Sequence, residues 1–386
     1  MQQASAFIIA ARRSALGRVG GLHRHRRIED LSAPVLLAAL ADAKVSPDEV
    51  EELIVGNATQ GGNPARLIAL TAGLPERVSA STVDRQCGSG LDAILAAART
   101  VAAGDAAIVV AGGAESISTA PWRIAKPKSL YQLPHFMSLE PVTSDRTDEP
   151  QLFEASERMS QKLGISRIQQ DQWALKSHLK AESAREAKRF VGEIVPLRAN
   201  PEEARDESAI GPSTKDLERL GPYMAGGGTL TPGNTSALHD GAAFVVVVSR
   251  AVWERLGKPK ALQVVGSAAQ GVEPDAEAGA PIEAMKKLYG RLNGFNPKDV
   301  GIVEMSESSA AQAIAFSSTL GLDDDLINPD GGAIVRGHPL GAAGAVLVVR
   351  LFTRMVRTGE AKRPAYGVVA LGTIGGMGLA ALFQAV

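Results

Sequence analysis

Apolar residues in the first third of the chain alternate between short continuous runs and sets spaced three and four positions apart. The continuous runs are rich in Val and Ile, which is typical of buried strands, whereas the spaced sets are typical of amphipathic helices. This pattern predicts a strand at the start of 7–16, helices over 28–45 and 63–74, and strands over 51–58 and 105–113.

The last third of the chain repeats this order of elements. A glycine-rich turn at 331–345 runs into a long helix, just as the turn at 84–94 does in the first third. The pattern predicts strands over 261–270, 300–307 and 365–371 and helices over 281–292 and 308–321. The sequence therefore predicts a duplicated α/β unit whose loops meet between the two halves.

The middle of the chain has a different character. Residues 119–240 are rich in Pro, Gly and charged residues, with a helical stretch at 165–190, which indicates an insertion that covers a ligand. We therefore expect a first half over 1–118 to which 241–257 return, an inserted lid over 119–240, and a second half over 258–386.

Composition narrows the class of protein. The 386 residues are 45% hydrophobic with a formal net charge of −1, which argues against a partner that is nucleic acid or a membrane surface. No apolar run reaches the roughly 18 residues of a membrane span, and the N-terminus has apolar residues ahead of its positive charges, the wrong order for a secretory signal. One cysteine forms no internal disulfide, and no Cys/His cluster has zinc spacing. We expect a soluble, cytoplasmic protein without a metal.

The single cysteine, Cys87, lies in DRQCGSGLDAI, directly before a predicted helix. The positive end of a helix dipole and its free N–H groups lower the pKa of a thiol, and Gly88 and Gly90 would leave the backbone open to a substrate. Taken alone, such a cysteine is more often a small buried residue. His338, in RGHPLGAAG, occupies the equivalent turn of the second half, and a Cys–His pair suits nucleophilic attack on an acyl carbon.

Five stretches of the chain carry a resemblance to the thiolase family. They are GNATQGGNPARLIALTAGLP (56–75), DRQCGSGLDAI (84–94), VVAGGAESIS (109–118), GTLTPGNTSALHDGAA (228–243) and GGAIVRGHPLGAAGA (331–345). The resemblance implies a five-layered αβαβα fold with two similar halves, a loop domain that binds coenzyme A, and a dimer or tetramer. It also implies a reversible reaction in which a 3-ketoacyl-CoA and CoA give two acyl-CoAs, with CoA as co-substrate and no permanently bound cofactor.

The resemblance assigns roles to individual residues. Cys87 would be the nucleophile that carries the acyl group. His338 would activate it and help to bind the thioester oxygen. Ser236, in GNTSAL, matches the family serine close to the pantetheine arm.

The chain departs from the family pattern at the expected second cysteine. In ALGTIGGMG (370–378), Gly372 stands where the family has a cysteine that acts as acid/base at the α-carbon, and Ile374 replaces a glycine. Glycine has no group that can move a proton. The chain also departs from the family pattern in the middle segment, where Gln151, Leu152 and Phe153 replace residues that often line the acyl pocket.

A further departure is SESSA (306–310), where most members read Asn-Glu-Ala-Phe-Ala. Ser306 replaces an asparagine that holds a water in an oxyanion hole, and Glu307 is either the usual structural glutamate or a stand-in base. The smaller residues at 309 and 372 remove volume beside the nucleophile, which favours a bulky, aromatic or branched acyl group unless neighbouring side chains refill the space.

Three functions stay open on the sequence. The first is an active, specialised thiolase in which Glu307, a water, a carboxylate of the substrate or a residue of a small partner subunit handles the α-proton. The second is a cysteine-dependent acyltransferase or acyl-CoA hydrolase without carbon–carbon chemistry. The third is a CoA-binding subunit without catalysis, against which the retention of both Cys87 and His338 speaks.

Overall fold

A computed structural model describes residues 6–127, 129, 131–137, 153–197, 204–207, 213–224, 226–358 and 365–386. The first half of the chain forms one side of a large mixed sheet. Its strands lie in the order β1 (Ala6–Ser14), β9 (His239–Ser249), β5 (Ile108–Glu115), β3 (Glu52–Gly56) and β4 (Ser79–Val83). β5, β3 and β4 are parallel, whereas β9 is antiparallel to both of its neighbours.

The second half repeats this arrangement. Its strands lie in the order β10 (Leu262–Gly271), β13 (Met377–Ala385), β12 (Tyr366–Thr373) and β11 (Val300–Met305). β13 is antiparallel to both of its neighbours, as β9 is in the first half. β12 is parallel to β11, as β5 is to β3. The halves join where β1 pairs with β10. The predicted duplication is confirmed in strand order and direction.

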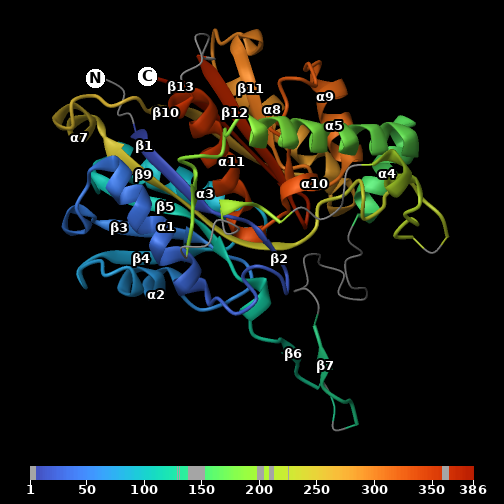
Figure 1. The fold of residues 1–386 in the computed structure, drawn as a ribbon, viewed down its shortest axis with the longest axis horizontal. Coiled ribbons are helices and arrows are strands. Elements are labelled where there is room, and N and C mark those ends of the chain that lie inside the picture. Colours follow the sequence, from blue (N-terminus) through green and yellow to red (C-terminus); the bar gives the residue numbers. More distant parts are fainter. Residues whose placement is uncertain are drawn as a thin grey trace.

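The helices complete five layers, as expected. α1 (Ile28–Ala43) and α2 (Pro64–Thr71) pack on the outer face of the first set of strands, and α8 (Ala280–Arg291) and α9 (Ala310–Leu320) on that of the second. α3 (Ser89–Ala103) and α11 (Leu340–Phe352) lie between the two sets (Figure 1). Every residue of α11 is buried, as its apolar character on all sides requires.

The strands are buried on both faces, which explains their continuous apolar runs. In β5, Val109 and Ala111 point into the central core, and Ile108 and Val110 into the outer core. This alternation follows from the period of two along a strand. The pattern of apolar residues does not single out β4 or β13, because a short apolar run does not distinguish a strand from a buried helix.

The inserted segment contributes a small helical body and a projecting hairpin. Its elements are α4 (Glu154–Leu163), α5 (Arg167–Glu186), α6 (Thr214–Glu218), β8 (Ile194–Val195), and the hairpin of β6 (Ile124–Ala125) and β7 (His135–Phe136). α5 begins with a capping box of Ser166 and Gln169, within the predicted helical stretch. Across the helices that the structure describes, none is both long and apolar enough to cross a membrane.

The remaining elements are short. They are β2 (Gly17–Arg18), α7 (Arg250–Arg255), α10 (Ala333–Arg336), a π-helical turn η6 (Thr353–Arg357), and the 3-10 turns η1 (Pro47–Glu49), η2 (Ile117–Thr119), η4 (Pro274–Gly279) and η5 (Pro297–Asp299). Of these, η4 and α10 lie next to the candidate site described below.

Candidate active site

Cys87 lies in a tight turn between β4 and α3. Gln86, the preceding residue, has a left-handed φ of 50°, and Ser89 secures the turn by donating to the Gln86 carbonyl at 2.6 Å and accepting from the Arg85 N–H at 2.8 Å. Cys87 itself is buried, with 6% of its surface exposed. The turn thus holds the thiol inside the protein at the start of a helix.

The glycines of this turn allow close packing on the sides where side chains would otherwise stand, and their role in substrate access stays a prediction. A Cβ atom at Gly88 would lie 2.9 Å from a side-chain carbon of Leu379, and one at Gly90 would lie 2.7 Å from the Gly341 carbonyl oxygen. The sides of the turn on which these Cβ atoms would lie are therefore filled by β13 and by α11. Glycine is required at Gly90 because two backbones meet there.

The contact at Gly90 brings the two predicted catalytic turns together. Gly341 is in the first turn of α11, and His338 lies just ahead of that helix, as Cys87 lies just ahead of α3. A Cβ atom at Gly344 would likewise lie 2.7 Å from Leu91. Because α3 and α11 pack against each other at their first turns, Cys87 and His338 project from equivalent positions of the two halves.

Burial controls the protonation of Cys87. It raises the pKa of the thiol to about 12, against backbone hydrogen bonds from Ile374 and from Cys87 itself that lower it, and the nearby charges of Glu277 and Glu115 raise it further. We expected the helix terminus to lower this pKa. The expectation is wrong because the free-energy cost of removing the thiolate from water exceeds the stabilisation that the two N–H groups provide.

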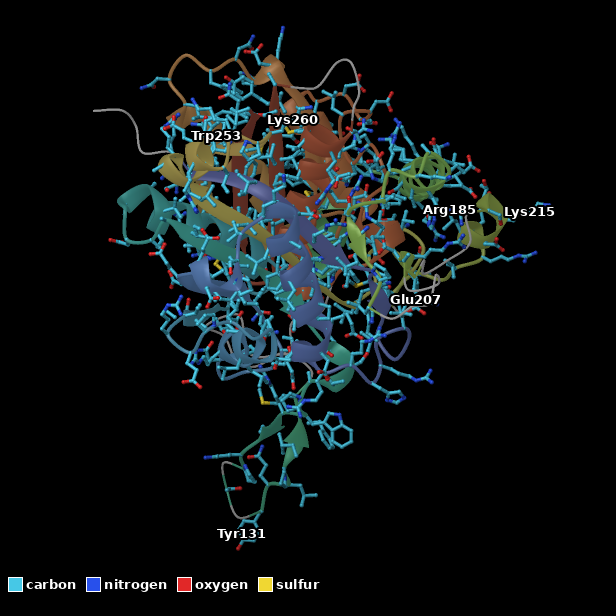
Figure 2. The ribbon with its side chains drawn as sticks, turned by 60° about the vertical axis from the view of Figure 1, so that its left-hand side comes forward. Tyr131, Arg185, Glu207, Lys215, Trp253 and Lys260 are labelled. Carbon is cyan, nitrogen blue, oxygen red and sulfur yellow. The ribbon has the colours of Figure 1, made fainter. Side chains whose placement is uncertain are left out.

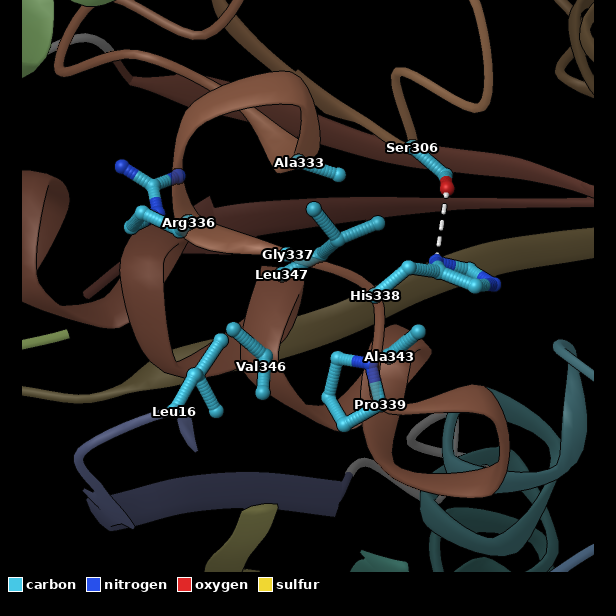
Figure 3. Close-up of a pocket in the computed structure, with 10 residues that line it drawn as sticks. All are labelled: Leu16, Ser306, Ala333, Arg336, Gly337, His338, Pro339, Ala343, Val346 and Leu347. Carbon is cyan, nitrogen blue, oxygen red and sulfur yellow. Dashed lines mark hydrogen bonds between the residues drawn. The ribbon is translucent and has the colours of Figure 1, made fainter. Parts of the chain in front are cut away.

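His338 is also buried and neutral. Burial, with a smaller contribution from the charge of His239, lowers the pKa of the imidazole to about 4. Ser306 Oγ lies 3.4 Å from His338 Nδ1, so the structure brings these two predicted site residues together (Figure 3). At neutral pH the imidazole therefore has a lone pair available to accept a proton.

A small cavity adjoins this pair. It has a volume of about 20 Å³, and its lining is mostly apolar, with Ser306, Arg336 and His338 as its polar residues (Figure 3). A water needs roughly 10–15 Å³ of such space and polar partners to bind. The cavity therefore has room for one water beside the imidazole.

Glu307 is held by three hydrogen bonds. Its carboxylate accepts from Trp173 Nε1 at 3.2 Å, from Ser177 Oγ at 2.9 Å and from the Ile334 N–H at 3.4 Å. Trp173 and Ser177 belong to α5, and Ile334 to α10. Of its two predicted roles, this geometry favours the structural one, in which the carboxylate ties the inserted helix to the second half.

Ser236 lies beside the same loop. Its N–H donates to the Ser308 carbonyl at 3.0 Å, and its hydroxyl donates weakly to the same oxygen at 3.4 Å. The neighbouring residue, Thr235, forms a bridge with Ser309. The predicted CoA-contacting serine is thus adjacent to the loop that carries Ser306 and Glu307. Across the described residues, no group of three or more His, Cys, Asp or Glu side chains could hold a metal ion.

Comparison with known families covers nearly the whole chain. A model of the thiolase N-terminal domain matches residues 6–251, and a model of the thiolase C-terminal domain matches residues 258–385. The chain belongs to the thiolase family. Thiolase relatives include an acetyl-CoA acetyltransferase of Cupriavidus necator, 36% identical with 97% of each chain covered. A cytosolic acetyl-CoA acetyltransferase of Rattus norvegicus is 37% identical, with 98% of this chain and 97% of that one covered.

Thiolase structures agree with the fold. The crystal structure of the Bacillus anthracis acetyl-CoA acetyltransferase superposes with a TM-score of 0.92 at 31% identity, covering 100% of this chain and 99% of that one. The family establishes this thiolase as an acyltransferase of the type that uses CoA thioesters.

The structure leaves less open space beside Gly372 than the sequence predicted. A Cβ atom there would lie 3.2 Å from Pro281 Cδ and 3.3 Å from Gln312 Nε2. Ser309, the other reduced side chain, is fully buried and accepts from the Gln312 N–H at 3.1 Å, which caps α9. Neighbouring groups thus take part of the volume that the substitutions release. Gln151 and Leu152, the other predicted residues of the acyl pocket, lie outside the described residues.

Sequence reasoning missed two groups of this thiolase site. One is the backbone N–H of Ile374, which hydrogen-bonds to Cys87. The other is Glu277, whose carboxylate Oε2 accepts from the Gly375 N–H at 3.0 Å. A backbone donor leaves no signal in a sequence, and Glu277 lies among the acidic residues Glu273 and Asp275, where it resembles part of a solvated loop.

Proposed function

We propose that this thiolase makes or cleaves the carbon–carbon bond of a 3-ketoacyl-CoA through an acyl group carried on Cys87. The observation that carries the proposal is the packing of α3 against α11 at their first turns, which presents a buried thiol and a neutral imidazole from paired helix ends. CoA and acyl-CoA are the substrates, and no permanently bound cofactor is invoked.

Acyl transfer follows from the protonation states. Because the thiol pKa is about 12 and the imidazole pKa about 4, no ion pair exists before the substrate binds. His338 takes the thiol proton as the sulfur attacks the thioester carbon, and it returns the proton to the departing CoA sulfur. The N–H groups of Cys87 and Ile374 hydrogen-bond to the sulfur. We propose that the same groups stabilise negative charge on the attacked carbonyl oxygen.

Ser306 contributes to a second oxyanion site in this proposal. Ser306 and His338 both line the water-sized cavity, and we propose that a water held there by the serine hydroxyl shares a developing negative charge with the imidazole. Ser306→Ala should therefore lower the rate of carbon–carbon bond cleavage more than the affinity for substrate.

The inserted segment, 119–240, is proposed to bind CoA, with Ser236 against the pantetheine arm. The relatives are named for acetyl-CoA. We propose a bulkier acyl group for this chain, aromatic or branched, on the small residues Ser309 and Gly372. Pro281 and Gln312 limit how much larger that group can be.

A homodimer or tetramer is supported by the projecting hairpin of β6 and β7. The hairpin extends away from the body of the protein, with Tyr131 at its far end (Figures 1 and 2). Its exposed large apolar side chains are Trp122, Ile124, Tyr131, Leu133 and Phe136. Exposed apolar side chains gathered on one feature are typical of a protein interface. An assembly with a small partner subunit is the alternative to a homo-oligomer. We also propose a cytoplasmic location.

The test is a product analysis with acetoacetyl-CoA and longer 3-ketoacyl-CoAs in the presence of CoA. A thiolase yields two acyl-CoAs, whereas the alternative acyltransferase or hydrolase yields a transferred acyl group or a free acid with the carbon chain intact. A catalytically inactive CoA-binding subunit yields no product. Cys87→Ala should abolish every reaction, and intact carbon chains from the wild type would refute the proposal.

A further inference from the structure

Glu277 lies at the turn that also contacts the nucleophile. Within the turn between β12 and β13, the Gly375 N–H donates to Glu277 Oε2 at 3.0 Å. The N–H of the preceding residue, Ile374, hydrogen-bonds to Cys87. Neighbouring amides of one turn thus hold the carboxylate and the sulfur, and left-handed turns of this kind are common anion sites.

The backbone that carries Glu277 is fixed against this turn. The Val272 N–H donates to the Gly376 carbonyl at 2.7 Å. A Cβ atom at Gly376 would lie 2.5 Å from the Val272 carbonyl oxygen, and one at Gly378 would lie 2.0 Å from the Ala280 carbonyl oxygen. Because the two backbones touch on either side of η4, the place of Glu277 relative to Cys87 is set by packing.

The same segment faces Gly372, the position at which this thiolase lacks an acid/base. A Cβ atom at Gly372 would point toward the segment and lie 3.6 Å from the Glu277 carbonyl oxygen. We infer that the carboxylate of Glu277 moves the proton at the α-carbon of the acyl-CoA. This inference rests on the proposed function, since the proton moves only if a carbon–carbon bond is made or cleaved.

Other carboxylates near the site are already committed. Glu115 accepts from the N–H groups of Ala58, Thr59 and Gly341, besides side-chain donors. Glu307 accepts from three donors of α5 and α10. Among the described residues, a single hydrogen bond, from Gly375, reaches the carboxylate of Glu277. Glu277 therefore has an oxygen left to accept a proton.

Electrostatics agree with this role. Burial raises the pKa of Glu277, and the Gly375 N–H and the charge of Arg158 oppose that rise, while Asp275 adds to it. The carboxylate is thereby a stronger base than an exposed glutamate. Its charge also raises the pKa of Cys87.

Condensation begins at the α-carbon of the second acyl-CoA. A Glu277 oxygen takes the α-proton of the second acyl-CoA, and the C–H electron pair becomes an enolate. The enolate carbon attacks the thioester carbon of acyl-Cys87, the new carbon–carbon bond forms, and the C–S bond breaks to release the Cys87 thiolate. The proton on Glu277 is then lost to solvent, and the released Cys87 thiolate takes up a proton from solvent through His338, which restores the resting thiol. In cleavage the same carboxyl group, protonated, returns its proton to the α-carbon.

The experiment separates the two half-reactions in Glu277→Gln and Glu277→Asp. Acylation is measured as transfer of the acetyl group from acetyl-CoA to Cys87 by intact-protein mass spectrometry. Proton movement is measured as deuterium uptake at the α-carbon of acetyl-CoA in D₂O by NMR, and as thiolysis of acetoacetyl-CoA. Because general acid–base catalysis contributes about 10²–10⁴-fold, Glu277→Gln should lose at least about 10²-fold in uptake and thiolysis and less than about threefold in acylation.

The controls define the outcomes. Glu273→Gln, an exposed glutamate of the same segment, should change neither rate, and Glu277→Asp should recover part of the lost thiolysis. Equal losses of acylation and uptake in Glu277→Gln, or unchanged uptake, would overturn the inference. A wild type that is acylated but exchanges no α-proton would also overturn it. A wild type that is not acylated would instead overturn the proposed function.

Discussion

Cys87, the proposed nucleophile of this thiolase, should react slowly with alkylating agents, although cysteine nucleophiles are commonly reactive. Burial raises the pKa of Cys87 from an ordinary 9.0 to about 12. Since only the thiolate reacts without a base, this rise in pKa predicts an alkylation rate at pH 8 about 10³-fold below that of an exposed thiol. Restricted access of the reagent would lower the rate further.

The assay is iodoacetamide alkylation of Cys87, followed by intact mass between pH 6 and pH 10. The rate should rise tenfold per pH unit without a plateau, because the whole range lies below the thiol pKa. His338→Ala should leave this slope unchanged, since the imidazole, with a pKa of about 4, is neutral throughout. A plateau between pH 6 and pH 8 that persists in His338→Ala would refute the reasoning, because it would mean that the resting thiol is already ionised without help from the imidazole.

Two further predictions concern packing and buried charge. Gly90→Ala should lower the stability by about 1–3 kcal/mol, because the added methyl group overpacks against Gly341, and it should slow the acylation of Cys87. Thermal unfolding measures the first effect and rapid-quench mass spectrometry the second. Unchanged stability and acylation rate would contradict the contact between α3 and α11. Glu193→Gln should cost about 1–3 kcal/mol in urea unfolding at pH 7, since it removes the buried carboxylate that Arg13 and Arg350 share. The two arginines keep the carboxylates of Asp206 and Asp330, which limits the loss. Although burial opposes them, these arginines lower the pKa of Glu193 from 4.5 to about 2. The stabilisation from the ionised carboxylate is therefore complete above pH 4.5 and is lost as the pH falls through 2. An equal difference in the free energy of unfolding between variant and wild type at pH 7 and pH 2 would contradict this.

The fold was largely predictable because its elements repeat. The strands β3, β5, β11 and β12 are continuous apolar runs, and α11 follows a glycine-rich turn, so both halves are visible as one pattern. The antiparallel β9 and β13 pair with strands far away in sequence, and no local pattern encodes that pairing.

The site was predictable only in part. Cys87 and His338 stand in turns that the repeat marks as equivalent, which is why sequence reasoning selected them. The protonation of Cys87 was not predictable, since it depends on burial by β13 and α11 and not on its neighbours in the chain. Glu277 was missed for the same reason, because its contact with Gly375 joins residues that are distant in sequence.

The central claim is that Cys87 carries the acyl group. Intact-protein mass spectrometry after separate mixing with acetyl-, succinyl- and benzoyl-CoA tests it directly, with Cys87→Ala as the control. The account predicts an added mass equal to the acyl group on the wild type and none on the variant, with more adduct from a bulky donor if the proposed acyl preference holds. No adduct from any donor, or an adduct that persists in Cys87→Ala, would contradict the account.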